Sequence, residues 1–167
     1  FLVQTPTREL AAQVHEHLES LGRYTPIRSS AVFGGVKPAP QERALRAGVD
    51  VVVATPGRLL DHMQQGIARF DALEVLVLDE ADRMLDMGFL PDIKRILAKL
   101  PKRRQTMLFS ATMPRPIAEL ARELLTDAVR LDVERPAAPA TGVRQAVLPV
   151  PEKLKPSLLL ELLRRHA

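Results

Sequence analysis

Short apolar runs alternate with helical patterns along most of the chain. Apolar residues that recur every three or four positions, such as Leu10, Val14 and Leu18, predict helices. The apolar runs between these helices predict five strands, at 1–4, 27–33, 49–54, 73–79 and 104–111. Strands that alternate with helices pair in parallel through right-handed crossovers. The predicted fold class is therefore α/β, with a parallel sheet sandwiched by helices.

The pattern changes toward the C-terminus. A helix after Pro114 and a short strand near 128–133 precede "ERPAAPATG" (134–142), whose Pro, Gly and small residues are typical of a linker. Beyond it, "VRQAVLPVP" and the Leu-rich stretch 153–165 predict one more strand and helix. We therefore predict a first domain at 1–132, a linker at 133–142 and the start of a second domain at 143–167. Because the chain opens at Phe1 inside an apolar run, we expect it to be a piece of a longer protein.

The sequence contains T-P-x-R twice, each time between a strand pattern and a helix pattern. Thr5 and Thr55 suit the N-cap, and the following Pro suits the first helical position, where its missing N–H would be unpaired anyway. Arg8 and Arg58 then fall in the first turn, where the helix macrodipole disfavours a cation. An anion bound at both helix ends would reverse that disadvantage, because N–H groups and arginine would attract it together.

Composition adds a weak preference for a polyanionic partner. Net charge is +4 and the sequence pI is about 9.8. Most of the basic residues are Arg, which binds phosphate well through two hydrogen bonds. Codon usage in a GC-rich genome would explain the excess of Arg equally well. With five Phe, one Tyr and no Trp, base stacking on aromatic rings would not dominate nucleic-acid binding.

Composition also limits the possible locations and metal sites. The absence of Cys excludes disulfides and Cys-based metal sites. Neither a signal peptide nor a long apolar run is present, so we expect a cytoplasmic protein without a membrane partner.

Residues with possible chemistry follow the predicted strands, and in parallel α/β sheets ligands bind at the carboxyl ends of the strands. Asp79, the first acid after a rigid apolar strand, suits Mg²⁺, which takes one or two carboxylates with phosphates and waters. Glu80 is suited to orient or deprotonate a water. The plainer alternative is a solvated acidic helix start. Ser110 and Thr112, on one side of an extended strand, would face Asp82.

The remaining titratable and sulfur-containing residues suggest no further site. The four histidines, His15, His17, His62 and His166, lie on polar helical faces or at the chain end, so we expect them at the surface. Met84 and Met87 adjoin other apolar residues and are expected in the core.

Five segments together resemble a DEAD-box ATP-dependent RNA helicase of superfamily 2: "PTRELA" (6–11), "GG" (34–35), "TPGRLLD" (55–61), "VLDEADRMLDMGF" (77–89) and "SAT" (110–112). Their order and spacing agree with that family. The resemblance implies that 1–132 is a first RecA-like domain and that 143–167 opens a second one. It also implies ATP and Mg²⁺ as cofactors.

The resemblance assigns a role to each matched residue. Asp79 would hold Mg²⁺ through water, and Glu80 would serve the catalytic water. Asp82 with Ser110 and Thr112 would couple the ATP state to RNA. The helix after Arg58 would act as a wedge that bends one RNA strand. The sugar-phosphate backbone of RNA would be contacted by Pro6, Thr7, Arg8, Gly34, Gly35, Thr55, Pro56, Gly57 and Arg58.

The expected function is thus part of an ATP-dependent RNA helicase that remodels short duplexes through sequence-independent backbone contacts. The family's Gln motif and its Gly-rich phosphate loop with Lys do not occur in these 167 residues, so we expect the chain alone to be inactive. The alternative is a non-catalytic RNA-binding or scaffold protein, against which the intact Asp79, Glu80 and Ser110 argue. We expect a monomer, with ribosomal or RNA-decay proteins as candidate partners.

Overall fold

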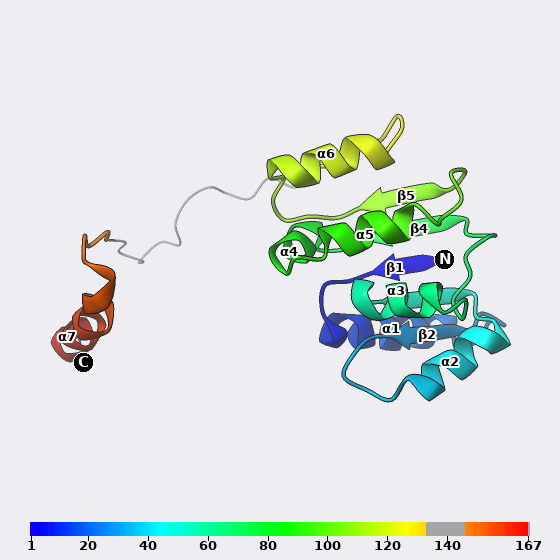
Figure 1. The fold of residues 1–167 in the computed structure, drawn as a ribbon, viewed down its shortest axis with the longest axis horizontal. Coiled ribbons are helices and arrows are strands. Elements are labelled where there is room, and N and C mark those ends of the chain that lie inside the picture. The colour runs from blue at the N-terminus through cyan, green and yellow to red at the C-terminus, as the bar shows by residue number, and fades with distance from the viewer. Residues whose placement is uncertain (133–145, 167) are drawn as a thin grey trace. The chain divides into compact units, whose positions relative to one another are not determined.

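The computed structural model describes residues 1–132 and 146–166 (Figure 1). It divides into two compact units, Phe1–Ala128 and Val129–Ala167. The first unit contains the whole sheet and every predicted site residue. Among the described residues, no helix combines the length and the apolar character needed to cross a membrane.

The first unit is built on one sheet of five parallel strands. The strands are β1 (Leu2–Gln4), β2 (Ser29–Val32), β3 (Val51–Ala54), β4 (Val75–Leu78) and β5 (Gln105–Leu108). Their order across the sheet is β2-β3-β1-β4-β5, and each neighbouring pair is parallel. The predicted α/β fold class is confirmed. Each strand is shorter than its apolar run, because the ends of the runs lead into loops.

Six helices connect and flank the strands: α1 (Arg8–Gly22), α2 (Pro38–Ala47), α3 (Pro56–Gln64), α4 (Ala81–Asp86), α5 (Leu90–Leu97) and α6 (Arg115–Leu124). The chain crosses from β1 to β2 in one direction and makes every later crossover in the other. Right-handed crossovers therefore place α1 on one face of the sheet and α3 and α5 on the opposite face. In agreement, α1 contacts β2 and β3, while α3 and α5 contact each other (Figure 1).

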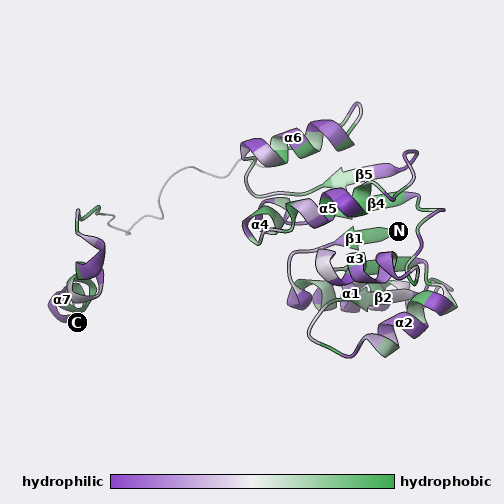
Figure 2. Cartoon of the chain, in the orientation of Figure 1, coloured by the Kyte–Doolittle hydropathy of each residue, from purple (hydrophilic) through white to green (hydrophobic). Residues whose placement is uncertain are grey.

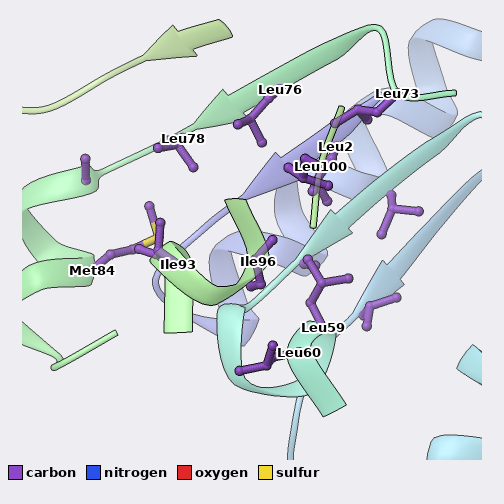
Figure 3. Close-up of a cluster of buried hydrophobic side chains, with 14 of the residues drawn as sticks. Leu2, Leu59, Leu60, Leu73, Leu76, Leu78, Met84, Ile93, Ile96 and Leu100 are labelled. Carbon is purple, nitrogen blue, oxygen red and sulfur yellow. The ribbon is translucent and has the colours of Figure 1, made fainter. Parts of the chain in front are cut away.

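The main core lies between the sheet and the α3–α5 face. Leu59 of α3 and Ile93 and Ile96 of α5 pack over Leu2 and Leu76 of the sheet (Figure 3). Figure 2 shows the same division along the chain, with hydrophobic strands and helices that carry hydrophilic residues on their outer sides. Strand β3 is buried at all four positions, as expected for a strand that is covered on both faces.

Two predictions about single side chains are wrong. His62 was expected at the surface, but it is only 1% exposed, because α3 buries residues on more than one side. Met87 was expected in the core, but it is half exposed, since α4 ends at Asp86 and Gly88 turns the chain with a φ of 79°. The helical period that would have buried Met87 stops before it.

Two predictions about backbone also need correction. Residues 128–132 form no strand: nothing pairs with them, and Val129 and Leu131 are 85% and 86% exposed. The N-cap of α1 is Thr7 rather than Thr5, and its hydroxyl accepts a hydrogen bond from the Leu10 N–H at 3.2 Å. Thr55 does precede α3, with Pro56 at the first position, although its side chain makes no capping bond.

The second unit contains the short 3₁₀ helix η1 (Glu152–Leu154) and α7 (Lys155–His166). Leu154, Leu159, Leu160 and Leu163 are exposed on it. The strand predicted at 143–151 does not form over 146–151, where the structure offers no neighbouring strand to pair with. Residues 143–145 and the predicted linker at 133–142 lie outside the described residues. The division into two RecA-like domains remains a prediction.

Candidate functional site

The carboxyl ends of all five strands meet at one edge of the sheet, as the sequence predicted. The loop after each strand carries one predicted group of residues. The strand order divides these groups into two halves: those after β2, β3 and β1 contain the arginines and the glycine pair, and those after β4 and β5 contain the acids and hydroxyls. We call these the basic half and the acidic half.

The turn after β4 holds two carboxylates in a constrained backbone. The Asp79 N–H donates to the Gln4 carbonyl at 2.9 Å, which fixes this turn to the central strand. The Asp79 carboxylate accepts a hydrogen bond from the Glu80 N–H at 3.0 Å. Glu80 has φ 50° and ψ 51°, a left-handed conformation that is uncommon for a residue other than glycine. Such backbone strain concentrates at functional sites, where surrounding bonds hold it in place.

The Glu80 side chain has a basic partner. Its Oε2 lies 3.1 Å from Nη1 of Arg83, one turn along α4. Both side chains are largely exposed, so this ion pair is weak and readily exchanged. A ligand near Glu80 would compete with Arg83 for the carboxylate.

Asp79 is the residue best suited to a divalent cation. It is half-buried, and burial raises its pKa; the hydrogen bond from the Glu80 N–H opposes this shift and the Glu80 charge adds to it. A cation would compensate for the desolvated negative charge. Among the described residues no group of three or more His, Cys, Asp or Glu side chains could hold a metal alone. The donor set thus fits Mg²⁺, which keeps waters and phosphates around one or two carboxylates, and not a metal held entirely by protein.

Asp82 ties the two strands of the acidic half together. Its Oδ2 accepts hydrogen bonds from the Thr112 N–H and hydroxyl, both at 2.8 Å. The Asp82 N–H donates to the Ser110 hydroxyl at 3.1 Å, and that hydroxyl donates to the Thr112 carbonyl at 2.7 Å. Burial opposes ionisation, but hydrogen bonds to the carboxylate, first those from Thr112, outweigh it, so the pKa of Asp82 is lowered.

The predicted contact between these groups is confirmed, although its geometry differs from the prediction. Strand β5 ends at Leu108, so Ser110 and Thr112 lie in the loop that follows and not on an extended strand. Ser110 bonds the backbone of Asp82, and Thr112 bonds its carboxylate. The Ala81 N–H also donates to the Phe109 carbonyl at 3.0 Å, which adds a second link between the two loops.

The basic half brings Arg8, Arg58 and the glycine pair together. Gly35 has a φ of 81°, a conformation that favours glycine, and a Cβ on it would lie 3.0 Å from Nη1 at the flexible end of the Arg8 side chain. Arg58 Nη1 donates a long hydrogen bond, 3.4 Å, to the Val36 carbonyl in the same loop. Both arginines lie in the first turn of their helices, as predicted.

The other residues predicted to bind RNA occupy different positions. Pro6, Thr55 and Pro56 are buried, so they set where the helices begin and do not present their side chains to a large ligand. Thr7 and Gly57 are partly exposed next to the two arginines.

Sequence reasoning missed three residues that contact this site. Glu9 forms an ion pair with Arg8, with Oε1 2.6 Å from Nε. Arg83 pairs with Glu80, and Gln41 of α2 donates to the Phe33 carbonyl just before the glycine pair. Only Gln41 left a signal in the sequence: it shares a helical face with Ala44 and Leu45, where a polar residue needs a partner.

A parallel sheet with an acidic turn fixed to the hydroxyls of the next loop, and with arginines at the same edge, defines a RecA-like helicase domain. The comparisons with known proteins agree. The profile of the DEAD/DEAH box helicase family matches residues 1–120, and this chain belongs to that family.

Curated relatives cover nearly all of the chain. The ATP-dependent RNA helicase DbpA of Bacillus subtilis (strain 168) is 42% identical over 162 residues, 97% of this chain and 34% of the relative. The ATP-dependent RNA helicase RhlB of Xanthomonas axonopodis pv. citri is 44% identical over 98% of this chain and 29% of its own length.

Two solved structures match three quarters of the chain. A hypothetical ATP-dependent RNA helicase from Sulfolobus tokodaii superimposes with a TM-score of 0.72 at 44% identity, over 75% of this chain and 38% of that one. A DEAD box protein from Methanococcus jannaschii gives a TM-score of 0.72 at 43% identity, over 75% and 34%. The chain therefore spans about a third of the length of the proteins that it matches.

Proposed function

We propose that this chain is part of an ATP-dependent RNA helicase that hydrolyses ATP and locally remodels RNA duplexes by contacting their backbone. The observation that carries the proposal is the network around Asp82. It joins the acidic turn to the next loop. Arg8 of the basic half follows β1, the strand next to β4, and Arg58 follows β3, one strand further. In this proposal a change at the acids would reach the basic half through β1, whose Gln4 carbonyl accepts a hydrogen bond from the Asp79 N–H.

In the acidic half, Asp79 would hold Mg²⁺ through water. The bound ion would screen the charge of the ATP phosphates. Glu80, held in a left-handed backbone conformation directly after Asp79, would orient the attacking water and accept its proton. Asp82, which hydrogen bonds keep ionised, would hold the Ser110–Thr112 loop in one position relative to the acids.

In the basic half, Arg8 and Arg58 would bind RNA phosphates, and the exposed N–H groups of their helix starts would add to the attraction. Contacts of this kind position RNA without reading its bases. None of the residues predicted to contact RNA is aromatic, so the predicted contacts include no base stacking. Little sequence preference is expected.

Replacing Glu80 by Gln tests the catalytic assignment in the complete helicase that carries this chain. Because the amide cannot accept the proton, RNA-stimulated ATP hydrolysis should fall by at least about 100-fold. RNA binding in the presence of a non-hydrolysable ATP analogue should stay within about twofold, since no phosphate-binding residue changes. Steady-state assays measure ATP hydrolysis, and fluorescence anisotropy measures RNA binding.

Glu16→Gln on the exposed side of α1 is the matched control and should change neither quantity. Unchanged hydrolysis in Glu80→Gln would overturn the catalytic role. RNA binding without any hydrolysis in the wild type would instead favour the non-catalytic scaffold. In the same assay, the isolated 167-residue chain should show no RNA-stimulated hydrolysis, because its sequence contains no Gly-rich phosphate loop with Lys.

A further inference from the structure

The loop between β2 and α2 contains the glycine pair, and three side chains from other elements determine its shape. We call Phe33–Lys37 the glycine loop. Arg8 packs against Gly35, and Arg58 donates to the Val36 carbonyl. The third side chain is Gln41, from the helix that follows the loop.

Gln41 is the buried one of these three. It is 6% exposed, and its Nε2 donates to the Phe33 carbonyl at 3.0 Å. The start of α2 gives the loop little other support: Lys37 makes no side-chain capping bond, and Pro38 and Pro40 have no N–H to donate. The Gln41 amide therefore links the loop to α2, at a helix start that has no capping side chain.

The orientation of the Phe33 carbonyl determines that of the next N–H. The peptide bond between Phe33 and Gly34 is trans and planar, so its C=O and N–H point in opposite directions. Because the Phe33 carbonyl points toward Gln41, the Gly34 N–H points away from α2. None of the described residues accepts a hydrogen bond from it.

We propose that Gln41 is a positioning residue for RNA binding: it holds the Phe33 carbonyl inward so that the Gly34 N–H is presented to an RNA phosphate held by Arg8 and Arg58. An unpaired backbone donor beside two arginines suits an anion. Gln41 itself does not touch the RNA. The inference rests on the proposed function, because it needs the basic half to bind RNA.

The test is a comparison of Gln41→Met with the wild type in the complete helicase. Methionine matches glutamine in length but cannot donate, so the carbonyl loses its partner and the loop becomes free to turn. The RNA concentration at half-maximal ATPase stimulation should rise about tenfold. The turnover rate at saturating RNA and the half-saturation concentration for ATP should stay within about twofold. Gln13→Met, on an exposed position of α1, is the matched control and should behave as the wild type.

Salt dependence separates positioning from direct phosphate binding. Gln41→Met removes no charge, so RNA affinity should fall by a similar factor at every salt concentration. Arg58→Ala removes a cation, so the slope of affinity against salt should also decrease, by about one ion. Equal RNA affinity of a folded Gln41→Met protein and the wild type would overturn the positioning role, and so would a flattened salt slope.

Gln41→Glu provides a second variant in case Met disturbs folding. The ionised carboxylate cannot donate, whereas the protonated acid can, and burial raises the pKa of a carboxyl group. Relative to the wild type, its RNA affinity should be reduced at about pH 8 and should recover in part toward about pH 6. No recovery would contradict the hydrogen bond as the cause. A wild-type protein that fails to bind RNA would contradict the proposed function and, with it, this role, whereas wild-type RNA binding that Gln41→Met leaves unchanged would contradict the role alone.

Discussion

At the scale of single residues, hydrogen bonds decide whether a group that loses contact with water keeps its charged form. Asp82 is partly buried but receives hydrogen bonds that favour its charged form. His62 is buried, both ring nitrogens lack a partner, and its pKa is lowered. Burial is the main cause, and the Arg58 charge adds to it, while Glu42 and Asp61 oppose it. His62 is therefore neutral in the folded protein at neutral pH.

This predicts a pH dependence of stability. The pKa of His62 is lower in the folded state than the value of about 6.5 in the unfolded chain. The unfolded state thus binds a proton more readily, and stability that is full above about pH 6.5 decreases as the pH falls toward the folded-state pKa. Between about pH 7.5 and 5.5, the free energy of unfolding of the 167-residue chain should fall more in the wild type than in His62→Leu, by at most about 1.4 kcal/mol per pH unit, the limit for one proton.

Urea titrations at the two pH values measure this difference. His62→Leu should also be at least as stable as the wild type at neutral pH, because it removes two unpaired buried nitrogens. His17→Leu, at an exposed position, should keep the wild-type pH dependence. The same pH dependence in wild type and His62→Leu would show that His62 does not titrate between the two states.

At the scale of elements, the starts of the helices set the geometry of the basic half. Helix α1 begins one residue after the side chain that caps it, so Arg8 occupies its first position. Helix α3 begins at Pro56 without a capping bond, so Arg58 occupies its third position. The repeated T-P-x-R sequence therefore produces two different helix starts, although both place an arginine at the same edge of the sheet.

The cap of α1 can be tested by Thr7→Ala. Loss of the hydrogen bond to the Leu10 N–H should lower the free energy of unfolding by about 1 kcal/mol. Thr7→Ser retains the hydroxyl and should recover most of that loss. Guanidinium unfolding of the 167-residue chain measures both. An equal loss in the two variants would mean that packing of the Thr7 methyl group, and not capping, stabilises this helix.

At the scale of the whole molecule, a single core connects nearly all elements of the first unit. Buried residues from β1, β2, β3 and β4 join those of α3, α4, α5 and α6 in one cluster. Ile96 lies near its centre, fully buried between α5 and the sheet (Figure 3). A cavity at Ile96 should therefore weaken the packing of every strand, because all of the strands pack against this core.

Ile96→Ala should lower the free energy of unfolding by about 2–5 kcal/mol. Because the core is shared, amide protons in all strands should lose protection from hydrogen exchange together. Leu21→Ala, at an exposed position, should change stability by less than about 0.5 kcal/mol. Lost protection confined to α5 would contradict a single cooperative core.

The sequence predicts the parallel sheet and the edge where the site lies, because apolar runs and helical stripes are local patterns. The sequence also predicts that Asp82 lies close to Ser110 and Thr112, because the carboxyl ends of parallel strands lie at the same edge of the sheet. It does not predict strand order, so the separation into basic and acidic halves appears only in the structure. Burial of His62 and the bond from Gln41 depend on which helices become neighbours, which no local pattern records.

Strand β1 lies in the middle of the sheet although it is the first strand of the chain. It pairs with β3 and β4 and not with β2. During synthesis at about 5–20 residues per second, roughly 2–10 s would pass between completion of β1 and completion of β3. For that time an apolar segment with two unpaired edges is exposed on the ribosome. The strand that later anchors Asp79 through the Gln4 carbonyl is thus made before both of its partners, and its edges stay unpaired until they follow.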